Sequence, residues 1–233
     1  MEKIPTGING LDEMLGGGLI PGRTYLVKGG PGAGKTTFAI QFLMEGVRNG
    51  ENVLYVTLEE PLETLKEDMA KLGFDLRNPK FHGIDATPVT ERKHLFAGAF
   101  YEEFGESFER LTGAIQEKVE LERYLRVAID PLTMLKLTVK NELEYRKTFI
   151  GFLKSLSKLG ATVVITSDLR TSDIEEYLTS GVIELRTIEA GGKILRGILV
   201  KKFRGSPFDE HIRPYRITER GIEVYHTENL FIE

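Results

Sequence analysis

Cysteine is absent from the 233 residues of this chain, which excludes disulfide bonds and thiolate metal sites. The four histidines are scattered, without the spacing of a metal site. No apolar run approaches the length that spans a bilayer, and Met1–Pro5 lacks the apolar stretch of a secretory signal. We therefore expect a cytoplasmic protein with no membrane partner.

Excess charge is also lacking, because the formal net charge is only −4. Such a balance gives no global attraction to nucleic acid, although it does not exclude a local basic patch. The length suits one large α/β domain or two small ones. No linker rich in Pro, Ser or Gly divides the chain, and no internal repeat is visible. We predict a single domain covering residues 1–233.

One motif dominates what is present. Residues 29–36 match G-x-x-x-x-G-K-[ST], between an expected strand at residues 23–27 and an amphipathic helix that stops at Gly50. Glycines allow successive N–H groups to point at phosphate oxygens, Lys35 brings positive charge to the β- and γ-phosphates, and Thr36 offers an oxygen to Mg²⁺. The expected phosphate-binding residues are Gly30, Pro31, Gly32, Ala33, Gly34, Lys35, Thr36 and Thr37. A chance glycine-rich turn is the alternative, and the strand–loop–helix setting argues against it.

Carboxylates follow two further apolar runs that read as strands. Residues 53–58 end at Glu59-Glu60, and residues 124–130 end at Asp130. A carboxylate beside the phosphate loop can orient a water and accept its proton, and side-chain alternation predicts that only one of the two glutamates faces the nucleotide. Pro61 suits the first position of the next helix. Asp130 is placed to hold Mg²⁺ together with Thr36. The alternatives are solvated glutamates and an ordinary Asp-Pro turn.

The segment from about residue 88 to residue 123 is less familiar. Aromatic residues recur there every fourth position, and the row continues to Leu111 and Ile115, which predicts one helix or two helices broken near Gly105. We prefer packing against the sheet or a neighbouring subunit over a lid or partner-binding element. The aromatic residues of this row are Phe96, Phe100, Phe104 and Phe108.

The second half first continues the alternation of helix and strand. Asn141 can cap a helix that ends at Gly160, and residues 162–166 read as a buried strand followed by Ser167-Asp168. From Gly181 the pattern changes to strand after strand. Runs at 182–187 and 193–200 flank a hairpin signal at Gly191-Gly192, and runs at 212–218 and 221–225 follow.

Several spaced elements together resemble one family. T-G-I-x-G-L-D from Thr6 to Asp12, a glycine cluster, the phosphate loop, K-x-R-G-S from Lys202 and I-R-P-[FY]-x-I-T from Ile212 are typical of the KaiC-like branch of RecA-superfamily ATPases, of the single-domain archaeal and bacterial RadA-paralogue type. The resemblance covers nearly the whole chain apart from residues 88–123. Two departures are Pro131 and Phe208, where relatives often have serine and histidine.

This resemblance implies an α/β, RecA-like P-loop NTPase fold: a mostly parallel central sheet, helices on both faces and a C-terminal antiparallel hairpin extension. It also implies ATP and Mg²⁺ as ligands and hydrolysis of ATP to ADP. It favours Glu59 as the base and makes Ser167 or Thr166 a sensor of the γ-phosphate or water, although a turn-forming Ser-Asp pair fits nearly as well. It places Lys202 and Arg204 at a neighbour's nucleotide site in a homo-oligomeric ring, usually a hexamer.

Two other function classes stay open. The basic residues Lys201, Lys202 and Arg204 suit a recombinase-like, DNA-binding ATPase, whereas the acidic net charge and the lack of an added N-terminal DNA-binding domain argue against nucleic acid. Alternatively, the chain is a nucleotide-gated binding module with little turnover, in which ATP only sets the assembly state. Composition alone would make the basic residues a solvated strand face.

Overall fold

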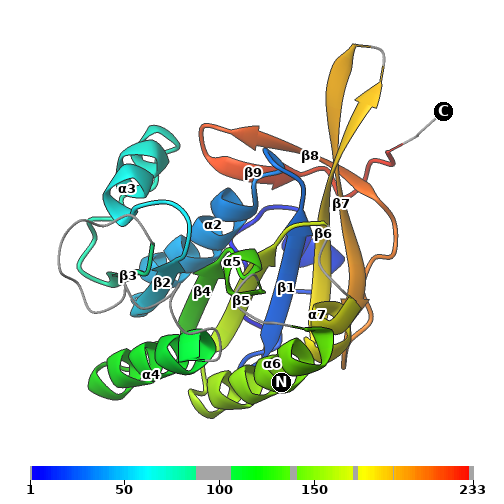
Figure 1. Cartoon of the computed structure of the whole chain (residues 1–233). Coiled ribbons are helices and arrows are strands. Elements are labelled where there is room, and N and C mark those ends of the chain that lie inside the picture. Colours follow the sequence, from blue (N-terminus) through cyan, green and yellow to red (C-terminus); the bar gives the residue numbers. More distant parts are fainter. Residues whose placement is uncertain (1, 88–105, 137–140, 170–172, 191, 231–233) are drawn as a thin grey trace.

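The computed structural model describes residues 2–87, 106–136, 141–169, 173–190 and 192–230. In this part of the chain, strands form a sheet in the order β3-β2-β4-β5-β1-β6-β7-β8-β9, with helices on both faces (Figure 1). The strands are β1 Thr24–Gly29, β2 Val53–Thr57, β3 Phe81–Asp85, β4 Arg126–Asp130, β5 Thr162–Ser167, β6 Gly181–Ala190, β7 Lys193–Phe203, β8 Arg213–Thr218 and β9 Gly221–Val224. The helices are α1 Leu11–Met14, α2 Lys35–Arg48, α3 Leu62–Lys71, α4 Glu106–Leu121, α5 Thr133–Lys136, α6 Glu142–Lys158 and α7 Asp173–Leu178.

The predicted fold class is confirmed. Strands β1 to β6 pair in parallel, and β6 to β9 form the antiparallel extension. Strand β1 lies between β5 and β6, so that Lys28 is level with Ser167 on one side and Glu184 on the other. Because parallel strands end at the same edge, the residues that follow β1, β2, β4 and β5 come together there.

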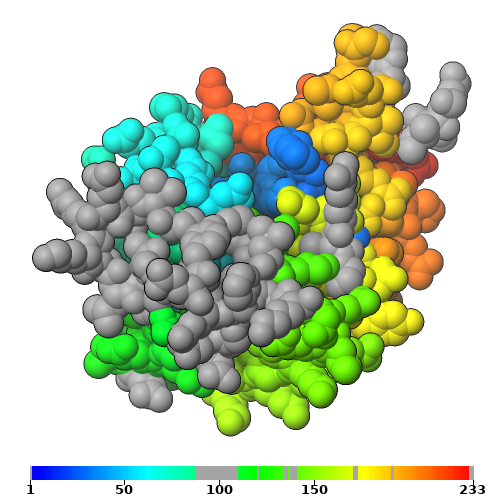
Figure 2. All heavy atoms as spheres, viewed as in Figure 1, coloured from blue at the N-terminus to red at the C-terminus, as the bar shows by residue number. Residues whose placement is uncertain are grey.

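The hairpin of β6 and β7 extends past the rest of the sheet. Strand β7 pairs with β8 only through Gly197–Pro214 and Ile198–Arg213, and beyond these pairs the two strands diverge. The hairpin therefore stands out from the body of the molecule in both the ribbon and the space-filling view (Figures 1 and 2). The two strands that flank residues 191–192 are thus longer than the sequence pattern indicates.

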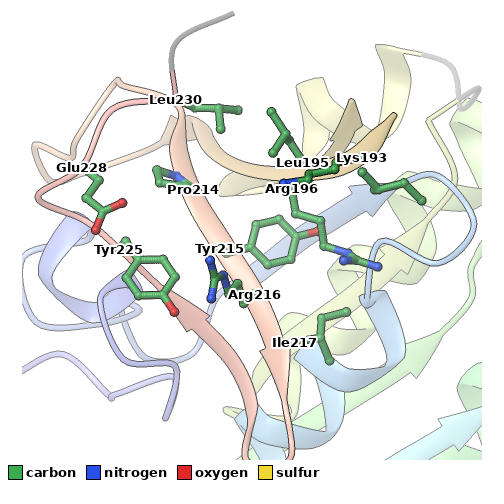
Figure 3. Close-up of a pocket in the computed structure, with 11 residues that line it drawn as sticks. Lys193, Leu195, Arg196, Pro214, Tyr215, Arg216, Ile217, Tyr225, Glu228 and Leu230 are labelled. Carbon is green, nitrogen blue, oxygen red and sulfur yellow. The ribbon is translucent and has the colours of Figure 1, made fainter. Parts of the chain in front are cut away.

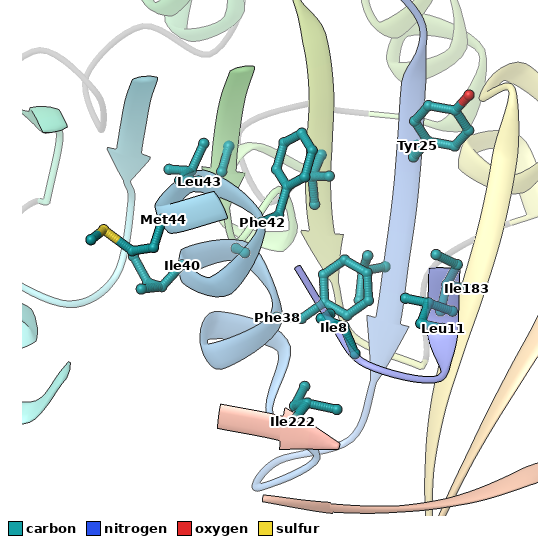
Figure 4. Packing of buried hydrophobic residues seen from close by; sticks show 14 of the residues in the cluster. Ile8, Leu11, Tyr25, Phe38, Ile40, Phe42, Leu43, Met44, Ile183 and Ile222 are labelled. Atoms are coloured by element: carbon teal, nitrogen blue, oxygen red, sulfur yellow. The ribbon is translucent and has the colours of Figure 1, made fainter. Parts of the chain in front are cut away.

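Buried side chains form a hydrophobic cluster on each face of the sheet, because residues alternate between the faces along each strand. One cluster joins α1, α2 and α3 to the sheet, with Phe38 and Phe42 projecting from α2 toward the strands, Ile8 beside Phe38 and Leu11 beside Ile183 (Figure 4). The other cluster joins α4, α6 and α7 to the opposite face. The strand after the phosphate loop helix illustrates this alternation, since Tyr55 belongs to the first cluster and its neighbours to the second.

Helix boundaries follow capping rules with one difference. The Asn141 side chain accepts a hydrogen bond from the Glu144 N–H and caps α6, as predicted. Pro61, expected at the first helical position, is instead the N-cap of α3, with an extended ψ of 136°. Its fixed φ suits either position, so sequence alone does not separate them.

The row of apolar residues spaced by four is described only in part. Leu111 and Ile115 are buried on α4, which packs on the same face as α6. Phe96, Phe100 and Phe104 lie outside the described residues, and the side chain of Phe108 is also outside them. No helix within the described ranges is both long enough and apolar enough to cross a membrane.

Candidate phosphate-binding site

A cleft of about 380 Å³ lies at the carboxyl ends of the parallel strands. It brings together the phosphate loop, the glutamate pair, Asp130 and Asp168, which come from four separate parts of the chain. The lining residues are Pro31, Lys35, Thr36, Tyr55, Thr57, Glu59, Glu60, Asp130, Pro131 and Asp168. The lysine, the threonine and the three carboxylates that the sequence predicts to act on phosphate, metal and water therefore line one cleft.

The loop conformation depends on glycine at two positions. Gly34 has a φ of 91°, which L-residues rarely adopt, and a Cβ there would lie 2.8 Å from Cδ1 of Ile217. Gly29 lies so close to the next strand that a Cβ would be 2.9 Å from the Leu185 carbonyl oxygen. The hydroxyl of Tyr215 donates a 2.6 Å hydrogen bond to the Ala33 carbonyl. Strand β8 thus holds the loop from behind, while α2 begins directly after it.

Lys35 is held inside the cleft by three oxygens. Its Nζ donates to the Gly29 carbonyl at 2.8 Å and the Gly30 carbonyl at 3.2 Å, and it lies 3.0 Å from Oδ1 of Asp168. Only 13% of the Lys35 side chain is exposed. The ammonium group is therefore close to the loop whose N–H groups would surround a phosphate.

Asp130 is a buried carboxylate that accepts three hydroxyl hydrogen bonds. Thr36 and Tyr55 each donate to Oδ2 at 2.7 Å, and Thr166 donates to Oδ1. Burial, with the nearby Asp130 carboxylate, raises the pKa of Tyr55 well above its ordinary value, so this phenol stays a donor. These contacts fix Asp130 beside the Thr36 hydroxyl.

The donor set fits Mg²⁺. Hard oxygens from one threonine and one carboxylate are the ligands this ion prefers, and it keeps several waters when bound with phosphates. Among the described residues, no three His, Cys, Asp or Glu side chains gather to form a metal site of their own. A metal ion here would therefore depend on phosphate oxygens and water as well as on Thr36 and Asp130.

The expectation that only one glutamate faces the cleft is wrong, because Glu59 and Glu60 both line it. Strand β2 ends at Thr57, and the alternation that would separate the two side chains ends with it. The Thr57 hydroxyl donates to the Glu60 carbonyl and shapes the bend. Burial, followed by Asp68, Asp130 and Glu59, raises the pKa of Glu60. The choice of Glu59 as the base stays a prediction.

Ser167 and Thr166 take different positions. Ser167 is fully buried, its Oγ lies 3.4 Å from the Thr133 hydroxyl oxygen, and it is not among the lining residues. Thr166, given as the other sensor candidate, bonds Asp130 instead. The role of Ser167 as a sensor therefore stays a prediction without a direct position on the cleft.

Lys202 and Arg204 do not line the cleft. The Lys202 ammonium donates to the carbonyls of Glu176, Tyr177 (3.0 Å) and Thr179 (2.7 Å), and Arg204 donates to Tyr177 at 2.8 Å. These carbonyls belong to the C-terminal end of α7, where cations are favourable. Partial burial, with Arg204 nearby, lowers the pKa of Lys202 to about 8. Both side chains therefore hold α7 within their own subunit.

Sequence reasoning missed Tyr55 and Thr57 as cleft residues, and it placed Asp168 at the end of a strand without predicting that it pairs with Lys35. Strand alternation could have placed Tyr55 and Thr57 on one face, and Thr57 lies level with Asp130 in the sheet. Nothing in the sequence near Asp168 indicates that it meets Lys35, because that contact depends on β5 lying next to β1.

A larger hollow of about 510 Å³ opens where β7 and β8 diverge (Figure 3). It shares no lining residue with the cleft and carries Arg196, Arg216 and Tyr225. The Arg216 guanidinium stacks 5.8 Å from the centre of the Tyr225 ring. The catalytic groups predicted from the sequence are not among its lining residues.

Comparison with known proteins agrees with this arrangement. The sequence profile of the family described as "ATPase: KaiC" matches residues 4–229, which is nearly the whole chain. The chain belongs to the KaiC family of ATPases. A KaiC-like protein of the archaeon Pyrococcus horikoshii has a solved structure with a TM-score of 0.82 and 28% identity, covering 96% of this chain and 98% of that one.

Relatives of two kinds match nearly the whole length of this chain. A UPF0273 protein of Aeropyrum pernix is 29% identical over 235 residues, covering 97% of this chain and 94% of the relative. The circadian clock oscillator protein KaiC of Synechococcus elongatus is 30% identical over 237 residues, covering 97% of this chain but only 44% of the relative. The clock protein KaiC3 of Synechocystis is matched over 46% of its length. This chain therefore spans somewhat less than half of the clock proteins.

Proposed function

We propose that this KaiC-family chain binds ATP with Mg²⁺ in the cleft and hydrolyses it to ADP and phosphate. The observation that carries the proposal is the meeting of Lys35, at the start of α2, with the hydrogen-bonded pair of Thr36 and Asp130 in one cleft. Membership of an ATPase family supports ATP as the nucleotide. Catalysis of phosphoryl transfer consists mostly of positioning and charge stabilisation, so few groups suffice.

The loop and Lys35 bind the phosphates in this proposal. The backbone N–H groups from Gly32 to Thr37 surround the β-phosphate, and the N-terminus of α2 adds its partial positive charge. Lys35 moves from the Gly29 and Gly30 carbonyls to oxygens of the β- and γ-phosphates. The exchange replaces the two neutral carbonyl acceptors by charged phosphate oxygens, which strengthens those two hydrogen bonds, whereas Asp168 is already a charged partner of Lys35.

Thr36 and Asp130 support the metal. Thr36 and Asp130 are the residues that would hold Mg²⁺, and their mutual hydrogen bond would keep the two oxygens together. When bound, Mg²⁺ neutralises phosphate charge at the reacting centre. The hydroxyl groups of Tyr55 and Thr166 keep the Asp130 carboxylate in one orientation.

A glutamate activates the attacking water. Glu59 is the base favoured by the family resemblance, and it is the more exposed of the pair. Glu60 carries a carboxylate with a raised pKa, which suits proton acceptance too. Both side chains line the cleft, so substitution of each separately assigns the role.

The assembly part of the proposal is a homo-oligomeric ring in which Lys202 and Arg204 act on a neighbour's γ-phosphate. Their hold on α7 places both cations together at one surface, beside the exposed Tyr177. A recombinase-like role in DNA binding gains less support. Lys201 is paired with Glu176 at 2.7 Å, and all three basic residues are therefore partly committed to α7.

Equilibrium binding tests the nucleotide site. Titration calorimetry with Mg-ATP should give saturable binding to the wild type and binding weakened at least tenfold in Lys35→Ala, because a charge-assisted contact to phosphate is lost. Lys158→Ala is the matched control, since this exposed lysine ends α6 next to the amino end of β5, away from the cleft at the carboxyl ends of the strands. Equal affinity in Lys35→Ala and Lys158→Ala would refute the site assignment.

A further inference from the structure

Asp168 pairs with Lys35 in the phosphate-binding cleft. It follows β5, whose last residue, Ser167, is level with Lys28 of β1 one residue before the phosphate loop. Its backbone N–H donates to the Thr133 hydroxyl at 3.2 Å, which fixes the turn. The Asp168 side chain is 48% exposed, whereas that of Lys35 is 13% exposed. The carboxylate is thus on the open side of the cleft and the ammonium on the closed side.

The cleft is acidic overall. Among the described lining residues, four carboxylates, those of Glu59, Glu60, Asp130 and Asp168, stand against the ammonium of Lys35. The Asp130 carboxylate is buried and is already satisfied by three hydroxyl groups. Asp168 differs because it is the carboxylate paired with the lysine that phosphates need.

A terminal phosphate and Asp168 therefore compete for the same cation. The lysine of a phosphate loop reaches both the β- and the γ-phosphate. With ADP, Lys35 can bridge the β-phosphate and Asp168, because the γ-position is empty. With ATP, the γ-phosphate takes the oxygen position facing Lys35 and adds negative charge next to Asp168, and like charges at this range repel.

We propose that Asp168 is a specificity-determining residue that pairs with Lys35 and selectively weakens the binding of the γ-phosphate. The inference rests on the proposed function, since it concerns the same cleft. Its consequence is that the protein binds ADP and ATP with more similar affinity than the loop alone would give. The γ-phosphate must displace Asp168 before Lys35 can serve the reaction.

Nucleotide affinities measured in pairs test this role. We would titrate wild type, Asp168→Asn and Asp168→Glu with Mg-ADP and with the Mg complex of the non-hydrolysable β,γ-imido analogue of ATP. Asp168→Asn should tighten the binding of the analogue roughly fivefold and the binding of ADP less than twofold, which is the scale of a partly exposed ion pair. Asp168→Glu keeps the charge and should retain the wild-type ratio within a factor of about two. The difference caused by Asp168→Asn should shrink in 0.5 M KCl, because salt screens exposed charges.

The control is Asp75→Asn, which removes the same charge near the opposite edge of the sheet, before β3, where Asp75 accepts a hydrogen bond from the Arg77 N–H. It should leave both affinities unchanged. Weaker binding of the analogue by Asp168→Asn, or equal tightening of both nucleotides, would overturn the inference while leaving the proposed function intact. Absence of nucleotide binding by the wild type would instead refute the proposed function, and this inference with it.

Discussion

Removing one hydroxyl, by Tyr55→Phe, should lower both the stability of the protein and its response to Mg²⁺. Tyr55 is 1% exposed, and its hydroxyl donates to Asp130, itself only 5% exposed. A hydrogen bond to a charged acceptor contributes about 1.5–3 kcal/mol. The phenyl ring remains, including its stacking on Phe81, so no large cavity forms. The free energy of unfolding should fall by about 2 kcal/mol.

This loss is measurable by heating. For a chain of this size, a change of 1 kcal/mol moves the melting temperature by roughly 2–4 °C, so Tyr55→Phe should melt about 4–8 °C lower. Because the pKa of Tyr55 is raised well above its ordinary value, the hydroxyl is protonated throughout the working range. The destabilisation should therefore be independent of pH between about 6 and 9.

The functional effect distinguishes a positioning residue from a merely structural one. With one of its three donors gone, Asp130 holds the Thr36 hydroxyl less firmly. Loss of such an outer-shell partner typically weakens metal binding about 10- to 100-fold. In a phosphate-release assay, Tyr55→Phe should need roughly tenfold more Mg²⁺ for half-maximal hydrolysis.

Tyr25→Phe is the matched control. Tyr25 is also 1% exposed, but within the described residues its hydroxyl bonds only the backbone N–H and carbonyl of Ile20, at 2.9 and 3.0 Å. This variant should lose stability and keep the wild-type Mg²⁺ requirement. If Tyr55→Phe and Tyr25→Phe show the same Mg²⁺ dependence, the role of Tyr55 through Asp130 is refuted.

The remaining predictions concern the glutamates and the ring. Glu59→Gln should reduce hydrolysis by roughly two orders of magnitude with nucleotide binding kept, whereas an inactive Glu60→Gln beside an active Glu59→Gln would reverse the assignment. Because the folded state raises the pKa of Glu60 above 4.5, the wild type loses stability relative to Glu60→Gln as pH rises from about 4.5 through the raised value. Urea unfolding at pH 4 and pH 7 checks this, and a constant difference would contradict it. Mixed Glu59→Gln and Arg204→Ala subunits should recover some hydrolysis, because a few interfaces regain both intact halves. A protein that remains monomeric with Mg-ATP, yet needs no Arg204 for full hydrolysis, would contradict the ring.

Much of the fold could be predicted because its signals are local. The phosphate loop lies between a short apolar strand and an amphipathic helix, and the structure has β1 and α2 there. Asn141 caps α6 through a contact three residues away, as the sequence predicts. The hairpin signal also marks β6 and β7 correctly. Each of these depends on neighbours within one or two turns of chain.

The parts that sequence reasoning mistook or did not predict depend on strand ends or on partners far along the chain. Side-chain alternation does not extend to Glu60, which lies three residues past the end of β2. The donors that hold Asp130 come from β2, β5 and α2, and only the register of the folded sheet brings Tyr55 to it. The Lys202 contacts with α7 span more than twenty residues. Such contacts require the order of strands in the sheet, which periodicity alone does not give.

The central proposal is that this chain hydrolyses ATP in this cleft. Measurement of phosphate release from Mg-ATP tests it most directly. The wild type should release phosphate in a reaction that EDTA stops, Lys35→Ala should release it at least a hundredfold more slowly, and Lys158→Ala should match the wild type. Release that continues without a divalent cation, or that is equal in wild type and Lys35→Ala, would contradict the account.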